Sequence, residues 1–125
     1  MKTITINATH KTPEIKGDIE TGHFSIKGKC IPEDARDFFD PFKDWFLELV
    51  KTDSQSICAE LDLEYFNTST SIILLDVFKK LRLLQKERDV RITWFYDVDD
   101  FEMEEVGQDY KVLVGDILEL KPKNS

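Results

Sequence analysis

The stretch that decides the fold is ICAELDLEYFNTSTSIILLDVFKKLRLL, residues 57–84. Every second side chain from Ile57 to Tyr65 is apolar or aromatic, and the positions between them carry Cys58 and three carboxylates. This alternation predicts a strand that is buried on one face. Apolar residues then recur at helical spacing from Leu74 to Leu84, and cationic residues lie near the end. The stretch therefore predicts a strand, a short polar turn and a helix.

The residues before this stretch predict an antiparallel start and one helix. Period-two alternation occurs at residues 4–6, at 15–19 and again from Phe24, after a turn that contains Gly22. From Pro32 the apolar residues change to steps of three and four, which indicates an amphipathic helix up to Val50. Pro41 lies inside this helix, so we expect either a kink there or a helix that starts late and is capped by Asp40.

The residues after it predict one more strand, a helix and a closing strand. Residues 90–96 alternate, Asp99 is a plausible cap for a third helix that ends at Gly115, and residues 117–120 form a last strand. The order β-β-β-α-β-α-β-α-β predicts a single α/β domain over residues 1–125. Its mixed sheet has an antiparallel N-terminal hairpin and a parallel second half. We expect the following residues to share one core: Trp45, Phe46, Leu61, Leu63, Leu74, Phe78, Ile92 and Trp94.

Composition disfavours several classes of partner. The chain has 125 residues and a net charge of −8, which disfavours nucleic acid and anionic membranes because both are bound through Lys and Arg. The longest aliphatic run, residues 72–75, is far shorter than the roughly 20 residues that span a bilayer. The first eleven residues contain no apolar stretch typical of a signal peptide. We expect a cytoplasmic protein that binds neither nucleic acid nor membranes.

The residues that carry chemistry do not assemble into an enzyme motif. The sequence has two isolated cysteines, Cys30 and Cys58, and no nucleophile–base or nucleotide-binding signature, so we expect no catalytic residue, cofactor or metal. The densest acidic stretch, residues 97–105, fails as a calcium loop because Glu102 and Gln108 stand at the sixth and twelfth positions, which require Gly and Glu. A small metal-binding protein or metal-dependent enzyme built on this stretch is a less favoured alternative.

The turn between the strand and helix of residues 57–84 contains Asn67 followed by four consecutive hydroxyls, Thr68-Ser69-Thr70-Ser71. One of these side chains is needed as an N-cap, because the first amides of a helix lack partners. The same amides favour a bound or attached phosphate, and the end of a parallel strand is where α/β proteins present functional groups. From spacing alone, capping and function both remain open.

Three stretches together resemble the SiaC family of bacterial regulatory phosphoproteins, whose members have a fold like the STAS domains of anti-sigma factor antagonists. The stretches are IPEDARDFFDPFKDW (31–45), LEYFNTSTS (63–71) and WFYDVDD (94–100), and YFNTS is the most specific part. The sequence departs from the family pattern at Ile72, where a lysine is expected. The resemblance covers nearly the whole chain and implies a STAS-like domain.

The resemblance also implies a partner switch. A histidine-kinase-like Ser/Thr protein kinase would phosphorylate the protein, and a PP2C-like Ser/Thr phosphatase would reverse the modification. The unphosphorylated form would bind and activate a diguanylate cyclase in cyclic-di-GMP and biofilm signalling, without enzymatic activity of its own. Thr68 is the implied phosphoacceptor, with Ser69 the second choice, and the implied partner-binding residues are Asn67, Thr68, Ser69, Thr70 and Ser71. A STAS-type antagonist that acts on an anti-sigma factor is the alternative.

Overall fold

The computed structural model describes residues 2–52 and 56–124, which form six strands and three α-helices in the predicted order. The strands are β1 (Thr3–Ile6), β2 (Glu14–Asp18), β3 (His23–Cys30), β4 (Ile57–Phe66), β5 (Val90–Asp97) and β6 (Leu118–Lys123). The helices are α1 (Ala35–Lys51), α2 (Thr68–Leu84) and α3 (Phe101–Val114), and a 3-10 turn, η1 (Gly115–Ile117), follows α3.

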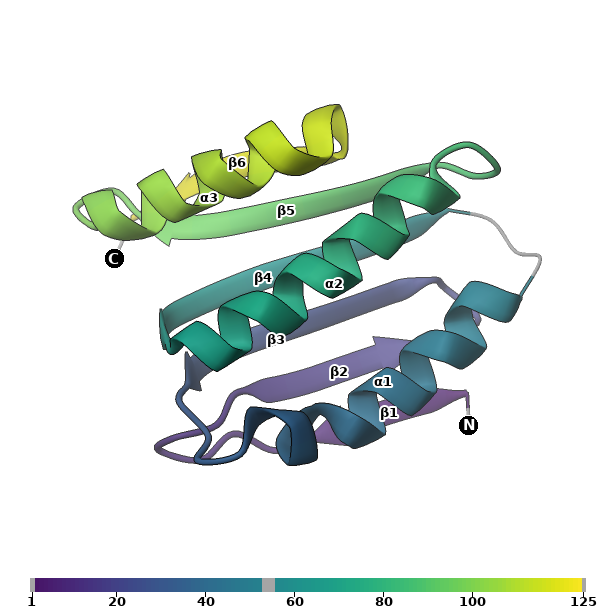
Figure 1. The fold of residues 1–125 in the computed structure, drawn as a ribbon, viewed down its shortest axis with the longest axis horizontal. Helices are drawn as coiled ribbons and strands as arrows, with labels where there is room; N and C mark the ends of the chain where they lie inside the picture. The colour runs from purple at the N-terminus through teal and green to yellow at the C-terminus, as the bar shows by residue number, and fades with distance from the viewer. Residues whose placement is uncertain (1, 53–55, 125) are drawn as a thin grey trace.

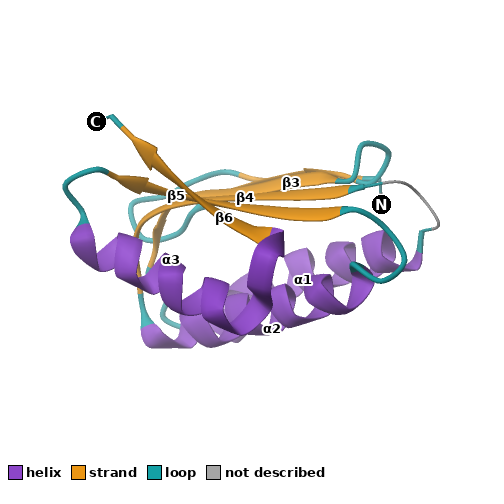
Figure 2. Cartoon of the chain, turned by 90° about the horizontal axis from the view of Figure 1, so that it is seen from above, coloured by secondary structure: helices purple, strands orange, loops and turns teal. Residues whose placement is uncertain are grey.

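The strands form one sheet in the order β1-β2-β3-β4-β5-β6. The first three pair antiparallel, and β3 to β6 pair parallel, which confirms the predicted mixed sheet. All three helices lie on one face of the sheet, and the other face is uncovered (Figures 1 and 2). Because the helices follow β3, β4 and β5, each begins at the edge where these parallel strands end. No described helix is long and apolar enough to cross a membrane.

One hydrophobic core fills the space between the sheet and the helices. It contains every residue that the sequence predicts for it: Trp45, Phe46, Leu61, Leu63, Leu74, Phe78, Ile92 and Trp94. The aromatic rings of α1 pack directly on β3, with the rings of Phe24 and Phe42 5.3 Å apart between centroids. The core prediction is therefore confirmed.

Helix α1 contradicts the alternative prediction, in which the helix starts only at Pro41 and Asp40 is its N-cap. Its N-cap is Asp34, whose carboxylate accepts a hydrogen bond of 3.1 Å from the amide of Asp37, and the helix continues through Pro41. Pro41 is exposed, while Phe39 and Phe42 on either side of it are fully buried. Continuous burial of this aromatic face outweighs the one backbone hydrogen bond that proline cannot make.

The end of β4 also differs from the prediction, because the alternation stops at Leu63. The register with β3 shifts there: Leu63 is opposite Gly28 and Tyr65 is opposite Lys29, which leaves Glu64 as an extra residue. Such a bulge reverses the side-chain alternation that follows it. Tyr65 is consequently 60% exposed instead of buried. Phe66 instead packs against the core under the start of α2, with its ring 6.0 Å from that of Trp94.

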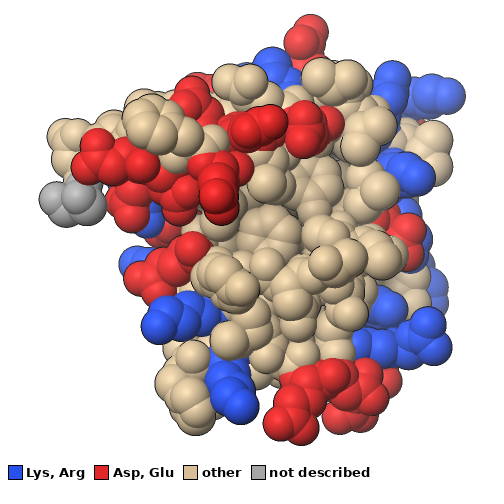
Figure 3. All heavy atoms as spheres, turned by 60° about the vertical axis from the view of Figure 1, so that its left-hand side comes forward, with Lys and Arg blue, Asp and Glu red and all other residues tan. Residues whose placement is uncertain are grey.

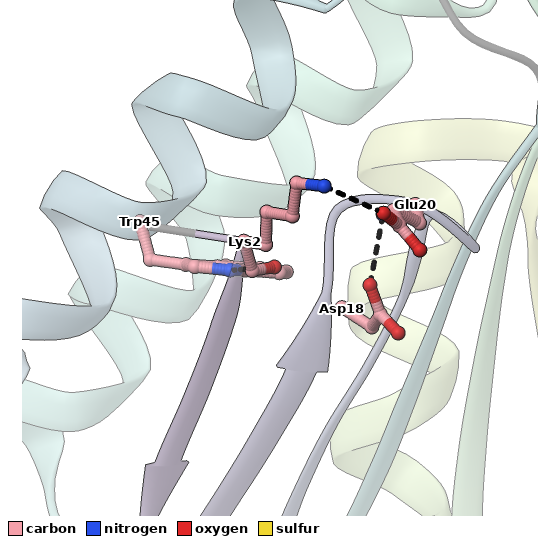
Figure 4. Close-up of polar contacts among 4 residues, drawn as sticks. All are labelled: Lys2, Asp18, Glu20 and Trp45. Atoms are coloured by element: carbon pink, nitrogen blue, oxygen red, sulfur yellow. Dashed lines mark hydrogen bonds and ion pairs between the residues drawn. The ribbon is translucent and has the colours of Figure 1, made fainter.

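A polar cluster ties α1 to the first hairpin (Figure 4). The indole nitrogen of Trp45 donates to the backbone carbonyl of Lys2 at 3.3 Å, and the Lys2 ammonium donates to Glu20 at 2.8 Å. This hydrogen bond raises the pKa of Lys2 and lowers that of Glu20. The backbone of Glu20 in turn donates to the carboxylate of Asp18 at 2.9 Å. The opening hairpin is thus held to the helix layer at the N-terminal end of β1.

Candidate functional site

The four consecutive hydroxyls form the first turn of α2, directly after β4. Asn67 is the N-cap: its side-chain oxygen accepts from the amide of Thr70 at 3.0 Å, and its side-chain nitrogen donates to the carbonyl of Pro32 at 3.2 Å. Thr68 is therefore the first helical residue, whereas the sequence predicts that it lies in a short turn before the helix. Both polar atoms of the Asn67 side chain are used, so this residue fixes where α2 begins.

Two of the four hydroxyls are engaged within the protein. Thr70 is fully buried, and its hydroxyl donates to the backbone carbonyl of Cys30 at 3.3 Å and lies equally close to the Cys30 thiol. The Ser71 hydroxyl donates to the carbonyl of Thr68 at 2.6 Å. The Thr70 contacts bind the first turn of α2 to the end of β3, and the Ser71 hydrogen bond lies within the turn.

The other two hydroxyls, those of Thr68 and Ser69, are accessible. Both residues are exposed, and neither hydroxyl has a hydrogen-bond partner among residues 2–52 and 56–124. The structure therefore separates the cluster into two structural hydroxyls and two hydroxyls that face water. Capping accounts for only part of this sequence motif.

The two free hydroxyls line different grooves. Thr68 lines a groove of about 370 Å³ between α2 and α3, which it shares with Asp109 and Tyr110. Ser69 lines a groove of about 400 Å³ between α1 and α2, together with Arg36 and Lys43. A group attached to Thr68 would consequently meet the surface of α3, whereas one on Ser69 would meet the start of α1.

The three helix N-termini at this edge differ in charge. Helices α1 and α3 have aspartate caps, Asp34 and Asp100, and further carboxylates in their first turns. The first turn of α2, which the structure describes in full, contains no acidic residue, and its cap is the neutral Asn67. Since a helix N-terminus carries a partial positive charge, the start of α2 is the one of the three that has no carboxylate in its cap or first turn.

Figure 3 looks obliquely onto this edge of the molecule. Uncharged residues occupy the middle of the view, and carboxylates gather above and below them. The two neighbouring helices carry exposed carboxylates: Glu102, Glu105 and Asp109 on α3, and Glu33, Asp34 and Asp37 at the start of α1. The two free hydroxyls therefore lie at the start of α2, whose neighbours α1 and α3 both begin with carboxylates.

One residue of the acidic stretch 97–105 has a structural role. Asp100, and not Asp99 as predicted, caps α3 by accepting from the amide of Met103 at 3.0 Å. Within the described part of the chain, no three His, Cys, Asp or Glu side chains gather as a metal ion would require. The carboxylates of Glu60 and Asp62 lie on the uncovered face of the sheet, where they contact His23 and Lys123 respectively.

The cysteines are poorly suited to nucleophilic chemistry. Burial raises the pKa of the Cys30 thiol to about 11. Burial, with a contribution from the Glu60 carboxylate, also raises the pKa of Cys58. Both thiols are therefore held in the neutral form near pH 7, whereas a nucleophilic cysteine needs a lowered pKa.

Sequence reasoning missed the part that α3 plays in the site. Val106, Tyr110 and Leu113 follow one another at steps of four and three in the predicted third helix, but this spacing gives no sign that they line the groove beside Thr68. The Tyr110 hydroxyl donates to the carbonyl of Ser71 at 2.9 Å, which joins α3 to the hydroxyl turn. A buried tyrosine needs a partner for its hydroxyl, and that requirement was the available signal.

Fold and site together define a mixed α/β protein with helices on one face, which presents two free hydroxyls at the start of its central helix. The model of the SiaC family of regulatory phosphoproteins matches residues 6–122, and the chain belongs to this family. An uncharacterised protein of Pseudomonas aeruginosa strain UCBPP-PA14 is 28% identical over 112 residues, which are 89% of each of the two chains.

Solved structures give the same result. SiaC of Pseudomonas aeruginosa matches with a TM-score of 0.89 and 25% identity, over 98% of this chain and 100% of that chain. The crystal structure of the diguanylate cyclase SiaD in complex with its activator SiaC, from the same organism, contains a chain that matches with a TM-score of 0.89. That chain is 24% identical, and the match covers 96% of this chain and 99% of that one, so it supports the fold.

Proposed function

We propose that this chain is a phosphorylation-controlled interaction switch, with Thr68 as the phosphoacceptor, whose unphosphorylated form binds and activates a diguanylate cyclase. A Ser/Thr kinase of the histidine-kinase-like type adds the phosphate in the cytoplasm, and a PP2C-like phosphatase removes it. The protein performs no catalysis itself. Membership of a family of regulatory phosphoproteins supports the modification, and the SiaD–SiaC complex supports the choice of partner.

The observation that carries the proposal is the state of the Thr68 hydroxyl. It is exposed, has no partner in the described residues, and stands at the first position of α2, whose first turn has no carboxylate. A phosphate brings roughly −1.5 to −2 charge at neutral pH, which the free amides of a helix N-terminus stabilise. The protein therefore tolerates a modified Thr68 without rearranging its fold.

The same phosphate blocks partner binding through desolvation. A doubly charged group in a close interface loses its hydration, and it regains that energy only if matched cations surround it in the complex. The groove beside Thr68 is lined by Phe66, Val106, Tyr110 and Leu113 as well as by Asp109, and none of these side chains is cationic. Phosphorylation of Thr68 consequently favours the free protein over the complex.

The test uses the purified chain with its kinase and its cyclase. Thr68→Ala should abolish phosphate incorporation while keeping cyclase activation, and Ser69→Ala, the matched control one residue away, should be phosphorylated normally. Full labelling of Thr68→Ala would show that the acceptor lies elsewhere. Equal activation by phosphorylated and unmodified protein would refute the switch, and capture of an anti-sigma factor instead of a cyclase would identify the alternative function.

A further inference from the structure

The outer surface of α2 carries a stripe of four residues that the proposed function does not use. Ile72, Asp76, Lys79 and Leu83 are all exposed, and they follow one another at steps of four, three and four. Because each residue of a helix turns by about 100°, these four side chains lie within about 60° of one another around the axis. Helix α2 is the middle helix of the layer, so the stripe runs along the centre of the helix-covered face (Figure 1).

The two ends of the stripe are large apolar side chains in contact with water. Ile72 is 61% exposed and Leu83 is 65% exposed. They are separated by three helical turns, which is about 16 Å along the axis. Single exposed apolar residues are common on protein surfaces, so the informative observation is the order of all four residues in the stripe.

Between the apolar ends lie one carboxylate and one ammonium group. Neither the Asp76 nor the Lys79 side chain makes an ion pair with any residue of 2–52 or 56–124. Both charges are therefore available to a second molecule, and they have opposite signs at neighbouring positions of the stripe.

The order apolar, acidic, basic, apolar is complementary to itself when it is read backwards. Two copies of α2 that pack antiparallel, about a twofold axis midway between Asp76 and Lys79, place Ile72 opposite Leu83 of the second copy. The same axis places Asp76 opposite Lys79 of the second copy. Each contact occurs twice, because a twofold interface uses the same patch of both molecules. A parallel arrangement would instead bring like charges together, which is unfavourable.

We infer that the chain forms a reversible homodimer in which the exposed stripes of two α2 helices pack antiparallel. This inference goes beyond the proposed function and needs neither the phosphate nor another protein. The contact is small, and the net charge of −8 on each copy opposes it, so the dimer belongs to the weak class of associations.

The start of α2 stays accessible in this dimer. Thr68 precedes Ile72 by one helical turn, whereas α2 ends directly after Leu83, at Leu84. Thr68 of each copy consequently extends past the end of the other copy's α2. The dimer therefore presents two exposed Thr68 hydroxyls, at opposite ends of the paired helices.

Sedimentation of the purified, unmodified chain at concentrations up to about 1 mM tests the dimer. Ile72→Gln and Leu83→Gln should each raise the dimer dissociation constant by about tenfold or more, because each removes two apolar contacts from a symmetric interface. Both positions face water and glutamine favours helices, so the fold should persist. The matched control is Val98→Gln, at an exposed valine between β5 and α3, which should change the constant by less than about twofold.

Charge reversal tests the antiparallel pairing itself. Asp76→Lys and Lys79→Asp should each weaken self-association by about tenfold or more, because each variant places two pairs of like charges in contact. An equal mixture of the two variants should form a mixed dimer, because every acidic position then faces a basic one. The mixed pair has the same net charge as two unaltered chains, so the comparison isolates the contact. The double variant Asp76→Lys with Lys79→Asp should likewise recover self-association.

Four results would overturn the inference. The unaltered chain could remain monomeric up to about 1 mM. A dimer could be insensitive to Ile72→Gln and Leu83→Gln, which would place the interface elsewhere. The mixed and double variants could fail to associate, which would exclude antiparallel stripes. Growth beyond the dimer would indicate an open head-to-tail contact instead. None of these measurements involves a kinase or a cyclase, so each result leaves the proposed function intact.

Discussion

The hydroxyl of Tyr110 donates a 2.9 Å hydrogen bond to the backbone carbonyl of Ser71 and so joins α3 to the first turn of α2. The tyrosine ring packs against two other aromatic rings. Its centroid lies 5.0 Å from that of Phe78 and 5.3 Å from that of Trp94. Burial raises the pKa of its hydroxyl to about 12, which keeps it protonated as a donor. The position of the turn that carries Thr68 is therefore coupled to the packing of α3.

Tyr110→Phe should remove this link while leaving the ring in place. We expect a loss of about 0.5–1.5 kcal/mol in the free energy of unfolding, the usual net value of one hydrogen bond. Amide exchange in the first turn of α2 should become faster. The matched control is Tyr96→Phe, because the Tyr96 hydroxyl makes only a longer contact of 3.4 Å, with the half-buried Glu104. Equal losses in the two variants, measured by urea unfolding, would contradict the coupling.

Gly107→Ala should destabilise the protein even though alanine favours helices. A Cβ atom at this position would stand 2.4 Å from Cδ1 of Trp94, and the indole cannot retreat because its nitrogen donates to the carbonyl of Met103 at 3.0 Å. The helix propensity gain of about 1 kcal/mol is smaller than the usual overpacking cost of about 1–3 kcal/mol. Gln108→Ala, at the exposed neighbouring position, should change stability by less than about 0.5 kcal/mol. A stabilised Gly107→Ala protein would contradict this packing.

Much of the fold was predictable because local patterns and burial agree. Residues 57–63 alternate in sequence and alternate in burial, and the apolar face of α1 is buried as its spacing predicts. The predictions fail where contacts between residues far apart in the sequence determine the structure. Tyr65 is exposed because a bulge opposite the β3 backbone shifts the register, and α1 continues through Pro41 because the aromatic residues around it pack on the sheet.

The candidate site was predictable as a cluster, and the roles within it were not. The sequence places four hydroxyls at a strand-to-helix junction. Which of them face water depends on the helical phase relative to the end of β3, and that phase buries Thr70 against Cys30. Sequence also cannot tell that Thr68 and Ser69 open into different grooves, because the grooves are made by α3 and α1.

The two thiols should differ in reactivity. Cys30 is fully buried, whereas Cys58 is half-buried on the uncovered face of the sheet. A thiol reagent should modify Cys58 in the folded protein and Cys30 only at the rate of unfolding. Cys58→Ala should leave a protein whose remaining thiol reacts as unfolding proceeds in urea. Rapid modification of Cys30 in that variant without denaturant would contradict its burial.

Stability should fall at alkaline pH. In the folded state the pKa of Cys30 rises from 9.0 to about 11, so the folded protein keeps a proton that the unfolded chain loses. Its contribution is fully present below the unfolded pKa and declines as pH rises from 9.0 towards 11. Cys30→Ala should therefore reduce the loss in urea midpoint between neutral and alkaline pH. An unchanged pH profile would contradict the assignment to Cys30.

A negative charge at position 68 should stabilise the fold, although we propose that it weakens binding of the partner. Helix amides at the start of α2 attract an anion, and the first turn supplies none of its own. The side chains of Thr68→Asp and Thr68→Asn have nearly the same shape, so the difference in unfolding free energy between the two variants isolates the charge.

The Asp109 carboxylate lines the same groove and opposes this charge, so the comparison is made with and without Asp109→Asn. With Asp109→Asn, the aspartate at position 68 should be more stabilising than asparagine by about 0.3–1 kcal/mol at low salt. With Asp109 present, the difference should be smaller, and high salt should reduce it in both backgrounds. Equal stability of Thr68→Asp and Thr68→Asn at low salt in the Asp109→Asn background would show that the start of α2 does not favour a phosphate.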